Sequence, residues 1–108
     1  MPTLETINTA LTTLNLKHGV GLYAGNPTVD HYILVPDYER PFEADNDDLF
    51  VDEHVNIEFH LGDDYRATIA SAKSLLKAAG IAVLESRYVE FEKEPQKHHY
   101  TLAAFGRI

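Results

Sequence analysis

Apolar residues at the start of the chain recur with the spacing of an amphipathic helix. Four of them lie three or four positions apart and so share one helical face: Leu4, Ile7, Leu11 and Leu14. Thr3 precedes them, and threonine favours a helix N-terminus because its hydroxyl accepts a hydrogen bond from a backbone N–H of the first turn. The pattern predicts a helix from Thr3 to about Asn15 with one face against the core.

Three segments without helical spacing follow this helix. Residues 20–24 mix β-branched and aromatic side chains before the turn sequence Gly25-Asn26-Pro27, and residues 31–35 form a compact apolar run before Pro36. We expect a short strand at each of these two places. Residues 37–48 hold two acidic clusters and a proline without a sustained period, which predicts a long exposed loop.

Residues 50–61 show the alternation of a half-buried strand. One set of side chains is expected to face the core: Val55, Ile57, Phe59 and Leu61. The other set is expected to face away from it: His54, Asn56, Glu58 and His60. Residues 63–80 regain helical spacing, and two further strands are expected at 81–92 and 97–107, joined by a short hairpin loop.

Together these elements predict an α+β fold. The expected order is α-β-β-β-α-β-β, in a single layer of mainly antiparallel sheet with two helices packed on one face. Short connections between successive strands favour the antiparallel pairings. Residues 1–108 are expected to form one domain, because nothing in the chain resembles a linker between two cores.

The chain is acidic, with a formal net charge of -8 at pH 7. Acid is concentrated in residues 37–64, where Arg40 is the single cation among eleven Asp and Glu residues. This balance disfavours binding to nucleic acid, because neutralising phosphates requires clustered Lys and Arg. The absence of cysteine excludes disulfides and thiolate metal sites and favours an intracellular origin. Neither a signal peptide nor a membrane span is expected.

The histidines and carboxylates raise the question of a metal or catalytic site. Four histidines come from two expected strands, with Glu58 between the first two: His54, His60, His98 and His99. No HExxH spacing accompanies them, so exposed strand histidines are the preferred interpretation and no metal is assigned. The run Asp45-Asn46-Asp47-Asp48 lacks the glycine and distal glutamate of a calcium loop. Glu90 and Glu92 share one expected strand face, but no apolar pocket is evident that would separate their pKa values.

Other catalytic patterns are missing from the sequence. No GxSxG nucleophile elbow is present, and Gly19-Val20-Gly21 is a glycine pair before an expected strand, whereas phosphate-binding glycines precede a helix. We therefore expect no enzymatic activity.

Several segments together resemble the small tail completion proteins of long-tailed bacteriophages. The resemblance begins with Phe42-Glu43-Ala44-Asp45-Asn46 and continues in Val55-Asn56-Ile57-Glu58-Phe59. A helix ending at Gly80-Ile81 and a final strand with His98-His99-Tyr100 follow. The resemblance covers nearly the whole chain.

This resemblance implies an α+β structural protein of the virion tail, made in the host bacterial cytoplasm, with no cofactor and no enzymatic activity. Members of the group complete or terminate the tail at the head–tail interface. They form a ring with copies of themselves, generally a hexamer, around the DNA channel. The implied partners are the major tail protein and the head connector or stopper protein, without sequence-specific nucleic-acid binding and without a membrane. The motifs do not separate completion from termination of the tail.

Residues 37–48 are the expected contact region for such partners. The candidate interface or channel residues are Phe42, Asp45, Asn46, Asp47, Asp48 and Phe50. The two phenylalanines are candidate interface anchors, with ordinary core packing as the alternative. The carboxylates either line the channel, where they would repel DNA phosphates, or form a solubilising outer surface.

Two alternative functions remain open on the sequence. One is a small histidine-dependent metal-binding protein or enzyme. The other is an acidic regulatory protein that mimics DNA and occupies a basic partner.

Overall fold

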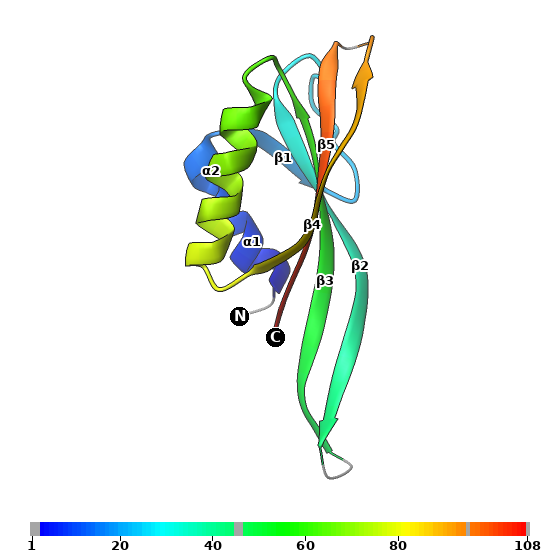
Figure 1. The fold of residues 1–108 in the computed structure, drawn as a ribbon. Coiled ribbons are helices and arrows are strands. Elements are labelled where there is room, and N and C mark those ends of the chain that lie inside the picture. Colours follow the sequence, from blue (N-terminus) through cyan, green and yellow to red (C-terminus); the bar gives the residue numbers. More distant parts are fainter. Residues whose placement is uncertain (1–2, 45–46, 95, 108) are drawn as a thin grey trace.

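The computed structural model describes the backbone of residues 3–44, 47–94 and 96–107, and the side chains of 3–36, 53–94 and 96–106 (Figure 1). The helical elements are α1 (Thr3–Leu11), its 3-10 extension η1 (Thr12–Leu14) and α2 (Tyr65–Ala78). The strands are β1 (Lys17–Val20), β2 (His31–Ala44), β3 (Asp47–Leu61), β4 (Ala82–Glu92) and β5 (Lys97–Arg107).

The five strands form one sheet in the order β1-β2-β3-β5-β4. β1 pairs with β2 in parallel, and the other three pairings are antiparallel. α1 and α2 cover one face of this sheet (Figure 1). The predicted α+β class, the element order and the placement of both helices on one face are therefore confirmed.

The core lies between the two helices and the sheet. α1 contributes Ile7 and Leu11, and α2 contributes Ile69, Ala72 and Leu76. The sheet contributes a larger set of buried side chains: Tyr32, Leu34, Val55, Ile57, Phe59, Leu61, Leu102 and Ala104. The predicted alternation of β3 is confirmed. Each fully buried Leu or Ile contributes about 1.5–3 kcal/mol to folding through its removal from water.

The first strand lies earlier than predicted. The expectation of a strand at 20–24 is wrong, because β1 ends at Val20. Gly21 then adopts a positive φ of 77°, which turns the chain out of the strand. A Cβ on Gly19 would lie 2.1 Å from the carbonyl oxygen of Leu22, so the backbone folds back on itself here. The turn therefore begins before the Gly25-Asn26-Pro27 sequence that was expected to end the strand.

The predicted loop at 37–48 is also wrong in the described residues. β2 continues to Ala44 and β3 begins at Asp47, while residues 45–46 lie outside the described part. β1 pairs with β2 only as far as Leu34, so the rest of β2 is free of a partner on that side among the described strands. A proline is tolerated on such an edge because its missing N–H is not needed for pairing. The pairing register between β2 and β3 shifts after Pro36 and after Phe42, where the two strands do not pair residue for residue.

The far end of the β2–β3 hairpin forms an arm. β5 pairs with β3 only from Asp52 to Leu61. The described residues beyond that point, 41–44 and 47–51, pair only with each other, and we call these residues the arm. The arm projects past the helices (Figure 1), and the molecule measures 51 × 23 × 21 Å along its principal axes.

Candidate functional site

The arm carries most of the residues that the sequence analysis placed at an interface. Phe42 pairs directly with Phe50, Glu43 with Asp48, and Ala44 with Asp47. Asp45 and Asn46 lie outside the described residues. The ladder thus brings the two phenylalanines opposite each other and places two acidic residues beside the tip.

An arm of this kind needs support from outside its own fold. A two-stranded ribbon is only marginally stable in water unless a third strand or another surface packs against it. Within the described residues, the arm pairs with no third strand. It also belongs to the segment in which acidic residues outnumber Arg40 by eleven to one. A surface that fits the arm should therefore combine apolar area with positive charge.

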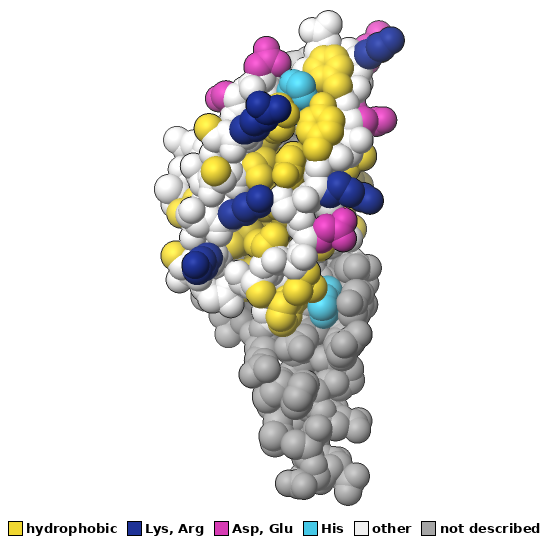
Figure 2. Space-filling model, viewed as in Figure 1, with side chains coloured by type: hydrophobic (Ala, Val, Ile, Leu, Met, Phe, Trp, Pro, Cys, Tyr) yellow, Lys and Arg dark blue, Asp and Glu magenta, His cyan; other side chains and the backbone are white. Residues whose placement is uncertain are grey.

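A groove with these properties lies between α2 and β4. Its volume is about 410 Å³, and it is lined by Lys73, Lys77, Ile81, Ala82, Val83, Leu84, Glu85 and Ser86. Figure 2 shows a strip of apolar side chains on this face of the molecule, with Lys and Arg side chains beside it. Both lysines come from α2, and Glu85 from β4 is the one acidic lining residue.

β4 is an outer strand of the sheet and exposes large apolar side chains. Leu84 is 60% exposed and Phe91 is 47% exposed, and Tyr88 and Val89 are also exposed. An outer strand offers unpaired backbone groups that another chain can use. The groove and the β4 edge together form a continuous candidate surface for association.

A second candidate site lies on the sheet face that the helices leave uncovered. His31, His60 and His99 stand at matching register positions on β2, β3 and β5. Their rings stack in a row, with centroids 4.8 Å apart for the first pair and 4.5 Å apart for the second. Tyr23 from the β1–β2 connection stacks on His31 at 4.0 Å and closes one end of the row.

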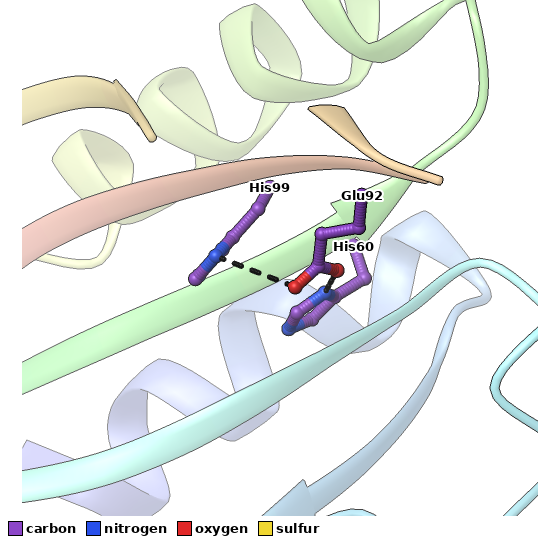
Figure 3. Close-up of side chains that lie close together, drawn as sticks. All are labelled: His60, Glu92 and His99. Atoms are coloured by element: carbon purple, nitrogen blue, oxygen red, sulfur yellow. Dashed lines mark hydrogen bonds and ion pairs between the residues drawn. The ribbon is translucent and has the colours of Figure 1, made fainter. Parts of the chain in front are cut away.

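Glu92 from β4 joins this row (Figure 3). Its Oε1 lies 2.7 Å from Nδ1 of His60, and its Oε2 lies 4.0 Å from Nδ1 of His99. On its other side, His99 has Nε2 3.7 Å from Oε2 of Glu58, which accepts a hydrogen bond from the Thr101 hydroxyl. His99 is thus placed between two carboxylates.

His31 is the most buried member of the row. Its Nδ1 donates a hydrogen bond to the Val29 carbonyl oxygen at 2.8 Å. Burial lowers the pKa of His31 below its ordinary value of 6.5, although the Val29 hydrogen bond acts in the opposite direction. Nearby, the Lys97 ammonium pairs with Asp30 and ties the β1–β2 connection to β5.

The structure brings together only part of the predicted histidine group. His60 and His99 meet, whereas His98 stacks on Tyr65 of α2 on the other face of the sheet, and His54 stacks on Phe105. The sequence analysis missed His31, although its cross-strand position opposite His60 is the feature that places it in the row.

The pairing register of β4 separates Tyr88 from Glu90 and Glu92. A plain alternation would put Tyr88, Glu90 and Glu92 on one side of β4. The register shifts between Tyr88 and Glu90, and this irregularity reverses the faces that follow it. Tyr88 therefore contacts Tyr65 on the helix side, while Glu92 meets the histidines on the opposite side.

Comparisons with known proteins give no match, either to the profiles of protein families or to characterised proteins. Among the helices of the described residues, none has the length and apolar character needed to cross a membrane.

Proposed function

We propose that this chain is a structural virion protein that completes or terminates the tail of a long-tailed bacteriophage. It acts at the head–tail interface as a ring around the DNA channel, without bond chemistry of its own. The observation that carries the proposal is the acidic two-stranded arm. The arm occupies the segment where the motif Phe42-Glu43-Ala44-Asp45-Asn46 resembles tail completion proteins.

Contacts between copies follow from complementary surfaces. The arm combines acidic residues with Phe42 and Phe50, and the groove between α2 and β4 combines apolar walls with Lys73 and Lys77. In this proposal the arm of one copy lies on the groove of the next copy. Such a contact uses two different surfaces of the chain, so it repeats head to tail and closes into a ring when the rotation between copies allows.

The acidic balance suits a protein that surrounds DNA without holding it. Carboxylates near the channel repel phosphates, so the genome passes without being gripped. The proposed partners of the ring are the major tail protein and the head connector.

The test uses the phage or prophage that encodes the chain. In the test variant, Asn-Gly replaces residues 41–51. Arg40 and Asp52 pair across the two strands, so this two-residue turn can connect them. Phages that lack the full chain should accumulate separate heads and tails in electron micrographs. Expression of the full chain should restore joined particles. Expression of the shortened chain should yield about tenfold fewer joined particles, or fewer still.

A matched control is Glu5→Gln, which removes one carboxylate from the exposed surface of α1. This variant should restore joined particles as well as the full chain does. The shortened chain should keep the circular dichroism and cooperative unfolding of the full chain, because the removed residues pair only with each other. The proposal fails if phages lacking the chain still make joined particles, or if a folded chain without the arm restores them fully.

A further inference from the structure

We infer that His60, His99 and Glu92 form a binding site for one divalent transition-metal ion of the zinc type. The donor atoms of these three side chains lie within 4.8 Å of one another. Two imidazole nitrogens and one carboxylate oxygen make up the His₂Glu set that proteins use for zinc, which leaves a fourth position for water. This site does not depend on the proposed role in the phage tail.

The geometry places the carboxylate between the two imidazoles (Figure 3). The Oε atoms of Glu92 lie 2.7 Å from His60 Nδ1 and 4.0 Å from His99 Nδ1. Donor atoms on a tetrahedral zinc ion lie about 3.3 Å apart when each bond is about 2.0 Å long. These two distances are to different oxygens of Glu92 and lie on either side of this value, so rotations of the three side chains would bring their donors to one ion.

A supporting carboxylate stands behind one of the ligands. The Nε2 atom of His99 is buried and makes no hydrogen bond within the described residues, but it lies 3.7 Å from Glu58 Oε2. Histidines that bind a metal through one nitrogen commonly donate the other N–H to a carboxylate, which fixes the tautomer. Metal at Nδ1 would hold the proton of His99 on Nε2, where Glu58 accepts it.

The surroundings are sheltered and still reachable. The side chains of His60, His99 and Glu92 are 15%, 18% and 26% exposed. A hollow of about 360 Å³ runs beside them and includes His60 and Glu92 in its lining. An ion can therefore reach the site from solvent, and it would lose most of its hydration water on binding.

Binding would join three strands at one end of the sheet. His60 belongs to β3, His99 to β5 and Glu92 to the last position of the outer strand β4. One ion would therefore link the C-terminal end of β4 to its neighbour β5 and to β3 beyond it. Because metal binds the folded arrangement and not the separated strands, it should raise the unfolding temperature.

The experiment titrates ZnCl₂ alone into the chelator-treated full chain, with isothermal calorimetry and native mass spectrometry as readouts. One zinc ion should bind per chain and raise the unfolding temperature. Co²⁺ in the same site should give the visible absorption of a four-coordinate nitrogen and oxygen site. His60→Gln, His99→Gln and Glu92→Gln should each abolish this binding, and Glu58→Gln should weaken it about tenfold.

Two histidines outside the cluster supply the controls. His98→Gln and His54→Gln make the same chemical change elsewhere on the sheet and should leave one zinc ion bound. If His60→Gln fails to fold, Glu92→Gln decides the matter, because this residue is at the end of an outer strand. The inference is overturned if the wild-type chain binds no zinc, or if binding survives in Glu92→Gln or is lost in His98→Gln.

Discussion

At the scale of single residues, one polar contact connects α1 to the buried centre of the sheet. Tyr32 is fully buried among apolar neighbours, and its hydroxyl donates a hydrogen bond to Oδ1 of Asn8 at 3.0 Å. A buried hydroxyl without a partner is costly, so Asn8 stabilises this arrangement by accepting the bond. The hydrogen bond links α1 to β2.

Tyr32→Phe removes this hydrogen bond and keeps the ring that fills the core. The variant should lose about 1 kcal/mol of unfolding free energy, because an ordinary intramolecular hydrogen bond contributes about that much. Urea denaturation measures the loss. The Asn8→Ala variant and the double variant complete a double-mutant cycle. If the two losses of unfolding free energy simply add in the double variant, the direct contact between Tyr32 and Asn8 is contradicted.

Tyr32 also predicts a dependence of stability on alkaline pH. Burial raises the pKa of Tyr32 from 10.0 to about 12. The folded-state pKa of Tyr32 lies above its unfolded-state pKa. The contribution of Tyr32 to the free energy of unfolding is therefore fully present below pH 10 and is lost as the pH rises toward 12. Urea denaturation across this window should show a smaller fall in stability for Tyr32→Phe than for the wild type. An equal fall in both would contradict the assigned cause.

The residues of the histidine row show where sequence reasoning ends. Alternation along β3 correctly places Glu58 and His60 on the polar face. The meeting of His60 with His31 and His99 depends on the register between strands, which alternation within one strand does not specify. The irregularity in β4 that puts Tyr88 and Glu92 on opposite faces is likewise not specified by alternation within the strand.

At the scale of elements, local patterns predict both helices and the last three strands well. Their apolar spacing and their turn residues act within short stretches of sequence. The arm was missed for a different reason. Its residues carry the proline and the acidic side chains typical of a loop, and only pairing between β2 and β3 makes them strands. Such pairing is a property of two segments together.

The positive charge of the groove comes from Lys73 and Lys77 on α2. Replacing Lys73 and Lys77 with Glu reverses the charge on the α2 side, so the acidic arm of a neighbouring copy should be repelled. Self-association on tail tubes should weaken about tenfold or more, measured by co-sedimentation of the purified chain. Lys93→Glu, in the β4–β5 connection, reverses one charge away from the groove and should have little effect.

A charge swap makes this test stricter. A chain with Asp47→Lys and Asp48→Lys in its arm should associate more weakly with itself than the wild type does. Association should recover when this chain is mixed with the chain that carries Lys73→Glu and Lys77→Glu. Recovery would identify the two surfaces as partners. If the groove variant associates as well as the wild type, then another surface mediates the contact between copies.

At the scale of the whole molecule, the shape and the charge support one account. A body of two helices on a five-stranded sheet carries the arm at one end (Figure 1) and a groove beside the outer strand β4. Because the two surfaces differ, each copy in the proposed ring would both give and receive a contact, and the ring would have a direction. The proposed metal site lies on the uncovered sheet face and would stabilise β4 in place.

The most direct measurement is an electron cryo-microscopy reconstruction of the head–tail junction in particles of the phage that encodes this chain. The account predicts a closed ring of copies at the end of the tail tube, with each arm lying along the α2–β4 groove of the next copy. A junction that lacks this chain, or a ring in which the arms contact no neighbouring copy, would contradict it.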